Sequence, residues 1–244
     1  MAQLTVVANR DEAAAHVAQR LVDTIVQARA AGRAPVHIAL AGGTTPAAAY
    51  ERAAALEPDW SGVELWLGDE RAVAPEDPES NERMVRETLL SRLTSGQPTL
   101  HGVAWPGTTE ELARAYARTL TVRVPAGADG IPALDLALQG LGEDGHTASL
   151  FPDQPTLDVT DALVIPVHDS PKPPPDRITF TLPVLRAPRA VIVLATGEGK
   201  ADAAAALVRD PDRHFPASLL TDLPNAEVVL DEAAASRIPA EARA

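Results

Sequence analysis

A histidine set between glycines and acids is the clearest candidate for chemistry in this chain. His146 lies in the run GEDGHT (142–147), directly after an expected apolar strand. Gly142 and Gly145 suit a tight turn, and Asp144 is close enough in the sequence to orient the imidazole. An imidazole oriented in this way is typical of a general base. A single histidine is more often structural, but the other histidines of the chain have less distinctive neighbours.

A glycine–threonine turn is a candidate anion site. The run Gly42-Gly43-Thr44-Thr45 follows a second expected strand and leads into a helix. Glycines allow the backbone to approach a ligand, and the hydroxyl and free amide groups at a helix start attract phosphate. The run lacks the lysine of a Walker loop and differs from the dinucleotide glycine pattern, so it favours a simple phosphate ester over a nucleotide. The structural alternative is a tight turn in which threonine caps the helix.

Two acids and an arginine follow a third expected strand. Asp69 and Glu70 could hydrogen-bond the hydroxyl groups of a polyol. Arg71 could bind a phosphate, or an oxyanion that develops during a reaction. The alternative is a surface salt bridge combined with a helix cap.

The lysines are unusual because the chain otherwise uses arginine. Only Lys172 and Lys200 are lysines among the 21 basic residues. Lys200 follows a fourth apolar strand at an expected helix start, where a cation is unfavourable unless an anion is bound, so we expect it to bind phosphate. We assign Arg177 to the same site, and Lys172, in a proline-rich loop, could flank it. The alternative is that codon bias explains the scarcity of lysine and that the two lysines are only solvated surface residues.

The elements that must position these segments alternate between strands and helices. Apolar strands joined by helices predict a Rossmann-like α/β fold, with a mainly parallel sheet, helices on both faces and a single domain over 1–244. Ligands bind at the carboxyl ends of such strands, so the segments should meet in one site. Strands are expected over 4–8, 36–41, 63–68, 134–140, 162–167, 177–182, 190–195 and 226–230, and helices over 11–31, from 46, and over 78–93, 109–121 and 199–208.

Composition narrows the function classes. The 244 residues are 45% hydrophobic and 23% charged, which excludes a disordered chain. The net charge of −13 argues against a nucleic-acid partner, and the absence of cysteine excludes disulfides and cysteine-type zinc sites. No apolar run approaches the ~20 residues of a membrane span. Residues 1–10 lack a basic region followed by an apolar stretch, so we expect no signal peptide. We expect a cytoplasmic protein without a membrane partner. We also expect a monomer, an expectation that does not come from the composition.

Six stretches together carry a family resemblance. The chain resembles the 6-phosphogluconolactonases of the glucosamine-6-phosphate isomerase/6-phosphogluconolactonase superfamily, and the GEDGHTASLFP run is highly specific for them. The matching stretches are AGGTTP (41–46), WLGDERAV (66–73), SNERMVRETLL (80–90), LQGLGEDGHTASLFP (138–152), DSPKPPPDRITFTLP (169–183) and TGEGKADA (196–203).

The resemblance implies hydrolysis of 6-phosphogluconolactone to 6-phosphogluconate without a cofactor or metal. It implies that His146 activates water and that Arg71 and Lys200 are the cationic partners of the phosphate. Asp144 completes the catalytic set. The remaining expected substrate-binding residues are Gly42, Gly43, Thr44, Thr45, Asp69, Glu70, Gly145 and Arg177, with the threonine loop holding the phosphate.

Two other functions remain as alternatives. A glucosamine-6-phosphate deaminase of the same superfamily typically has a glutamate after the histidine turn and Asp-Glu-Tyr at 69–71, and this chain has neither. A sugar-phosphate sensor without catalysis should carry a DNA-binding segment, and no basic helix-turn-helix is visible here. Both differences favour the lactonase.

Overall fold

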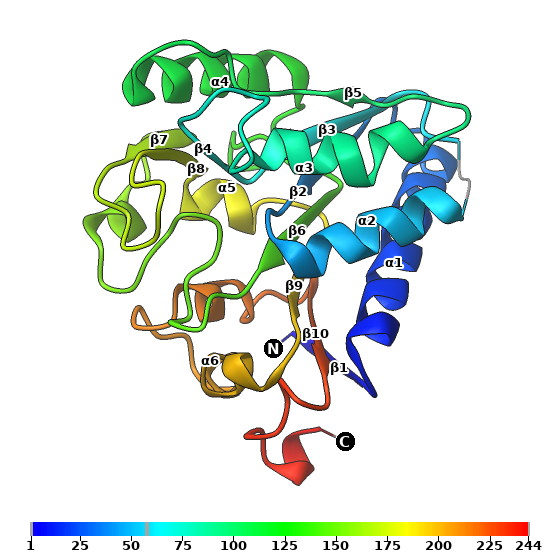
Figure 1. Cartoon of the computed structure of the whole chain (residues 1–244), viewed down its shortest axis with the longest axis vertical. Coiled ribbons are helices and arrows are strands. Elements are labelled where there is room, and N and C mark those ends of the chain that lie inside the picture. Colours follow the sequence, from blue (N-terminus) through cyan, green and yellow to red (C-terminus); the bar gives the residue numbers. More distant parts are fainter. Residues whose placement is uncertain (1, 57–58, 244) are drawn as a thin grey trace.

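A parallel sheet of seven strands forms the centre of the protein. The computed structural model describes residues 2–56 and 59–243. Every neighbouring pair of strands in this sheet is parallel, in the order β1-β10-β9-β6-β2-β3-β5 (Figure 1). The strands are β1 (Gln3–Val7), β2 (Val36–Leu40), β3 (Val63–Leu67), β5 (Thr99–Leu100), β6 (Leu136–Gly140), β9 (Val191–Ala195) and β10 (Ala226–Asp231).

Helices cover both faces of this sheet, as the sequence predicts. Alternate residues of β2 show why: Ile38 packs in one apolar cluster with α1 and α2, and Ala39 packs in a second cluster with α4. Figure 1 shows α1 and α2 along one side of β9 and β10, with α6 along the other. The helices are α1 (Arg10–Ala30), α2 (Thr44–Ala55), α3 (Asn81–Thr88), α4 (Thr109–Arg123), α5 (Leu182–Arg186) and α6 (Ala201–Ala206).

The strand order reverses between β2 and β6. From β2 the chain adds β3 and β5 on one side, and from β6 it adds β9 and β10 on the other. The two strands share only two register pairs, Ile38 with Leu136 and Ala39 with Ala137. A crevice at the carboxyl ends of two such strands is where ligands bind in open α/β sheets. The segments after Leu40 and after Gly140 therefore border the expected binding position.

A second, antiparallel sheet corrects one expectation. The segments 162–167 and 177–182 were expected in the main sheet, but β7 (Val164–Val167) and β8 (Arg177–Phe180) pair with each other and with β4 (Asp69–Arg71) in the order β4-β8-β7. The connection from β7 to β8 is too short for the helical crossover that a parallel pair requires, so the two strands form an antiparallel hairpin.

Several helix boundaries also differ from expectation. Helix α3 begins at Asn81 because the Ser80 side chain accepts a hydrogen bond from the Arg83 amide. Helix α2 begins at Thr44, two residues before the proline expected at its start, and α6 is shorter than the expected 199–208. Strand β5 and helix α5 were not expected, and 3₁₀ turns occur at Leu90–Arg92, Pro155–Asp158, Glu198–Lys200, Pro216–Leu220 and Ala240–Ala242.

No helix within 2–56 and 59–243 has both the length and the apolar character needed to cross a membrane.

Candidate active site

A cavity of about 340 Å³ opens at the carboxyl ends of β2 and β6, where the strand order reverses. It is lined by residues from all four of the segments that the sequence singles out. Its lining residues are Ala41, Gly42, Gly43, Asp69, Arg71, Asn81, Gly140, Leu141, Gly142, His146, Ala148, Lys172, Arg177 and Lys200.

His146 lies on the cavity wall and is hydrogen-bonded to Asp144, which is outside the lining within the described residues. The imidazole Nδ1 of His146 lies 2.5 Å from Oδ1 of Asp144. A carboxylate can only accept, so Nδ1 carries the proton and the lone pair is on Nε2. Within the described residues, no protein group hydrogen-bonds that Nε2. The pair can therefore take a proton from a molecule in the cavity.

Burial sets the protonation of this pair. Desolvation lowers the pKa of His146 below its usual value of 6.5, although the hydrogen bond and charge of Asp144 act in the opposite direction. Burial by itself would raise the pKa of Asp144, but the hydrogen bond and charge of His146 outweigh it, and the pKa lies below its usual value. The imidazole is therefore neutral at neutral pH, which is the form required of a base.

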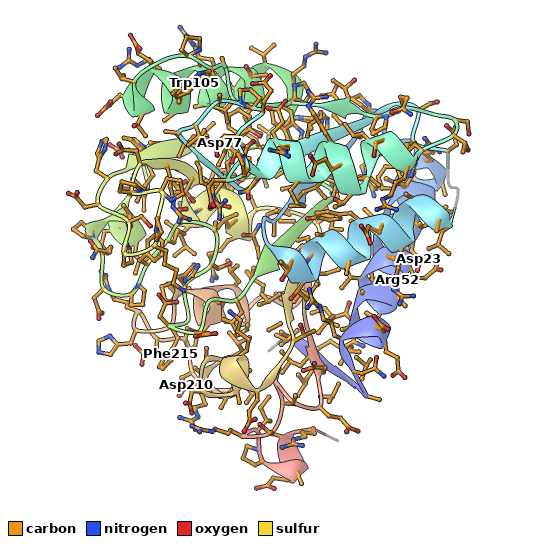
Figure 2. All side chains as sticks on the ribbon, viewed as in Figure 1. Asp23, Arg52, Asp77, Trp105, Asp210 and Phe215 are labelled. Atoms are coloured by element: carbon orange, nitrogen blue, oxygen red, sulfur yellow. The ribbon has the colours of Figure 1, made fainter. Side chains whose placement is uncertain are left out.

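A tight turn presents His146 to the cavity. A Cβ on Gly142 would lie 2.0 Å from Nδ1 of His146, so only glycine leaves room for the ring there. Gly145 has φ of +83°, and a Cβ at that position would meet the ring of Phe215 at 2.6 Å. Phe215, labelled in Figure 2, lies on the segment that precedes β10. Gly145 therefore shapes the turn and, within the described chain, is absent from the cavity lining, so its expected substrate contact stays a prediction.

The threonine loop borders a second cavity of about 240 Å³ next to the first. Five residues line both cavities: Gly42, Gly43, Gly140, Leu141 and Lys200. Thr44 and Thr45 line only the second. Gly43 has φ of +101° and precedes α2 without a side-chain cap. The first amide groups of a helix have no partner inside it, so this loop offers N–H donors to an anion.

Lys200 also lines the second cavity. It lies in the 3₁₀ turn Glu198–Lys200 that follows β9. Thr196, at the end of the same strand, places its hydroxyl 3.1 Å from that of Thr45. Burial lowers the pKa of Lys200, while neighbouring Glu143 raises it. A partly buried ammonium beside free backbone donors is an anion site of the kind expected from the sequence.

Arg71 lines the larger cavity with a partly fixed guanidinium. Its Nη1 donates to the backbone oxygen of Glu79. Its Nε has no hydrogen-bond partner in the part of the chain that the structure describes, but it is buried and so enclosed by protein. Within the described residues Arg71 is absent from the lining of the threonine-loop cavity, so its expected contact with the phosphate stays a prediction.

Asp69 also faces the cavity, within a buried polar network. Its Oδ2 accepts a 2.7 Å hydrogen bond from the Ser149 hydroxyl, and Nη1 of Arg177 lies 3.9 Å away. Asp69 is only 8% exposed, yet it is part of the cavity lining. Its carboxylate is therefore oriented before substrate arrives.

Glu70 lies outside the cavity lining, which differs from its expected place. Its carboxylate accepts from the backbone amides of Arg71, Asn81 and Glu82 and from the Ser80 hydroxyl. Two of these amides belong to the first turn of α3, whose unpaired N–H groups need acceptors. Burial raises the pKa of Glu70 to about 7, against the effect of the three amide donors. Glu70 thus anchors α3 to β4, and nothing in the described chain places it against a ligand.

Arg177 lines the cavity, but its donors serve the protein. Its Nε donates to the Pro174 oxygen, and its Nη2 donates to the Lys172 and Pro173 oxygens. The side chain is 5% exposed and lies 5.8 Å from the Phe151 ring. Its position fixes the loop between β7 and β8.

Seven lining residues were not among the expected site residues: Ala41, Asn81, Gly140, Leu141, Gly142, Ala148 and Lys172. Asn81 donates from Nδ2 to the Asp69 backbone oxygen over 2.9 Å. Ala148 has φ of +49°, a left-handed conformation uncommon for a residue other than glycine. Lys172 was expected only as a flanking residue. The run SNER could have suggested a helix cap, but no local pattern points Asn81 at a cavity.

Within residues 2–56 and 59–243, no three His, Cys, Asp or Glu side chains gather as metal ligands would.

Comparisons with known proteins agree with this architecture. The model of the family described as glucosamine-6-phosphate isomerases/6-phosphogluconolactonase matches residues 8–230. A 6-phosphogluconolactonase from Streptomyces coelicolor is 39% identical over 248 residues, covering 97% of this chain and 95% of that protein. The 6-phosphogluconolactonase of Homo sapiens is 39% identical, covering 89% and 86%.

Solved structures agree as well. A 6-phosphogluconolactonase from Trypanosoma brucei superimposes with a TM-score of 0.83 at 28% identity, covering 98% of this chain and 99% of that one. A monomeric glucosamine-6-phosphate deaminase, 20% identical with a TM-score of 0.78, shares the fold. The chain therefore belongs to the glucosamine-6-phosphate isomerase/6-phosphogluconolactonase family.

Proposed function

We propose that this protein hydrolyses 6-phospho-D-glucono-1,5-lactone to 6-phospho-D-gluconate, the second step of the oxidative pentose phosphate pathway. Relatives that are 36–41% identical bear the name 6-phosphogluconolactonase. The observation that carries the proposal is the pairing of two features in one crevice. A neutral imidazole with a free Nε2 lies on the wall of one cavity, and an anion-binding loop borders the cavity beside it.

The phosphate would occupy the smaller cavity. Gly43, Thr44, Thr45 and Lys200 line it, and their amide, hydroxyl and ammonium groups are the donors we assign to the phosphate. With the phosphate bound there, the lactone ring would lie in the larger cavity, which is lined by His146 and Asp69. Phosphate binding then serves to place the carbonyl carbon near the base, which reduces the entropy cost of the reaction.

His146 would act as the general base. Nε2 takes a proton from water as the water oxygen attacks the lactone carbonyl carbon. When the tetrahedral intermediate collapses, the bond from this carbon to the ring oxygen breaks, and the proton passes to that oxygen as it leaves. A lactone is an activated ester, so one base that contributes about 10²–10⁴-fold, together with positioning, is sufficient without a nucleophilic serine or cysteine.

The other polar residues would orient the substrate. Asp69 faces the larger cavity and can accept hydrogen bonds from ring hydroxyls, and Arg71 supplies a cation near them. The proposed reaction uses no cofactor. We further propose that the protein acts in the cytoplasm as a single-domain monomer, since one chain supplies both the imidazole and the anion loop.

The test is proton release from freshly prepared 6-phosphogluconolactone, with and without protein. Such lactones open spontaneously, so the enzymatic rate is the excess over the protein-free rate. Saturable release above this background supports the proposal. Ammonia release from glucosamine 6-phosphate would instead support a deaminase, and tight calorimetric binding of the lactone without acid release would support a sensor.

A further inference from the structure

We propose that Lys172 contacts the substrate directly, with its ammonium group binding the carbonyl oxygen of the lactone, and that Arg177 is the positioning residue that holds Lys172 in place. This inference rests on the proposed hydrolase function. It gives the two lysines of the chain different roles: Lys200 binds the phosphate, and Lys172 binds the carbonyl oxygen at the reacting carbon.

The two lysines lie at different ends of the crevice. Lys200 lines both cavities, including the one that contains the threonine loop. Lys172 lines only the larger cavity, and its Nζ lies 3.8 Å from Oδ1 of Asp144. Since Asp144 is hydrogen-bonded to His146, Lys172 places its charge beside the base. Because Lys172 also lines the cavity that would hold the lactone ring, its flexible side chain can bring the ammonium to the carbonyl oxygen.

The loop that carries Lys172 is fixed by its main chain. The Lys172 carbonyl oxygen accepts hydrogen bonds from Nη2 of Arg177 over 2.9 Å and from the Ser170 hydroxyl over 2.9 Å. Arg177 also holds the oxygens of Pro173 and Pro174. A guanidinium has donors in a rigid fork, which suits it to bind several carbonyl oxygens at once.

The side chain of Lys172, in contrast, is free to act. It is 44% exposed, and its contact with Asp144 is at the length of a weak ion pair. The main chain of Lys172 stays in place while its flexible side chain moves. The ammonium can therefore follow the carbonyl oxygen as that oxygen moves out of the ring plane. Lys172 also lowers the pKa of His146 through its charge, against Asp144 and Asp69, which raise it.

The proposed contact enters the reaction at one step. Attack by water forms a carbon–oxygen bond and moves the carbonyl π electrons onto the carbonyl oxygen, opposite the Lys172 ammonium. His146 holds the proton from water. As the intermediate collapses, the electron pair returns, the ring carbon–oxygen bond breaks, and the leaving oxygen takes the proton from His146. Lys172 stabilises the oxyanion without a net transfer of its own proton.

The experiment compares kcat and KM for the wild type, Lys172→Ala, Lys172→Arg and Arg177→Lys, with melting temperatures measured in parallel. Removal of one oxyanion donor costs about 10²–10³-fold in kcat. We expect Lys172→Ala to lose kcat on this scale with a smaller change in KM, and Lys172→Arg to recover part of it. Lys172→Ala should also move the acid limb of the pH–rate profile to higher pH, because His146 loses a neighbouring positive charge.

A double-mutant cycle tests the role of Arg177. If Arg177 acts through Lys172, the Lys172→Ala/Arg177→Lys variant should be no slower than Lys172→Ala alone. If the fold-loss in kcat of the double variant equals the product of the two single fold-losses, Arg177 acts independently of Lys172. That result would overturn its positioning role. The cycle is measured on variants whose melting temperature equals that of the wild type. The contact between Lys172 and the carbonyl oxygen is tested by Lys172→Ala alone, whatever the behaviour of the Arg177 variants.

Failure of the inference is distinguishable from failure of the proposed function. A wild type without lactonase activity overturns both. An active wild type with a Lys172→Ala variant of unchanged kcat, or one changed only in KM, overturns the oxyanion contact and leaves the hydrolase proposal intact.

Discussion

The side-chain oxygen of Asn81 lies directly over the α-carbon of Gly42, where a Cβ would meet it at 2.1 Å. Asn81 is held in place from its other side by the Asp69 backbone oxygen and, through the start of α3, by Glu70. The contact joins the segment after β2 to the segment after β3. It ties the phosphate loop to the acid that faces the larger cavity.

Substitution of Gly42 by alanine should therefore disturb the site. The new methyl group must displace Asn81 or shift the loop, and misplacement by about 1 Å can cost about 10²-fold in rate. We expect kcat/KM to fall at least about tenfold. Addition of Asn81→Ala should restore the melting temperature but not the activity, and a fully active Gly42→Ala enzyme would contradict this account.

The pH–rate profile should report the depressed pKa of His146. Because burial lowers this pKa below 6.5, the imidazole stays neutral to a lower pH than a free histidine. We expect kcat/KM to be level around neutral pH and to fall with acid, with a midpoint below 6.5, after subtraction of the spontaneous rate. A midpoint above 6.5 would be inconsistent with a desolvated base.

Replacement of Lys200 by alanine should mainly weaken substrate binding. Its ammonium lines the cavity of the threonine loop, so KM for the phosphorylated lactone should rise while kcat changes much less. Unphosphorylated glucono-1,5-lactone provides the control, because its KM should not change in this variant. An unchanged KM for the phosphorylated substrate would count against the phosphate role.

Glu70 should make stability depend on pH. Its pKa rises from 4.5 to about 7 on folding, so the folded state keeps a proton that the unfolded state loses. The contribution of this proton to the free energy of unfolding is fully present below pH 4.5. It is lost as the pH rises through about 7, and the total loss is up to about 3 kcal/mol.

Urea unfolding of the wild type and Glu70→Gln at pH 5 and pH 8 measures this effect. The glutamine variant is less stable overall, because its amide nitrogen cannot accept the hydrogen bonds that the second oxygen of Glu70 accepts. The wild type should nevertheless lose more stability than the variant between the two pH values. Equal losses in both proteins would show that Glu70 does not titrate in this range.

The sequence predicts the positions of the site segments well. Gly42, His146 and Lys200 each follow a strand that is mostly apolar and almost entirely buried, and near-continuous apolar runs of this kind identify strands of a parallel sheet. Since the carboxyl ends of such strands meet at one edge, convergence of these segments follows from the pattern alone.

The second sheet and the roles of Glu70 and Arg177 could not be predicted in the same way. Periodicity reports burial but not the partner of a strand, so β7 and β8 look like members of the main sheet. The partners of Glu70 are backbone amides at the start of α3, and those of Arg177 are loop carbonyls. Backbone groups have no sequence signature, so a side chain that binds them resembles one that binds a ligand.

The turnover of His146→Ala tests the central claim most directly. Proton release gives kcat, calorimetry with 6-phosphogluconate gives binding, and His214→Ala, which removes an exposed histidine, is the matched control. We predict a fall in kcat of about 10²–10⁴-fold, binding within a few-fold of wild type, and a control that is fully active. Near-normal turnover by His146→Ala would contradict the assignment of the base.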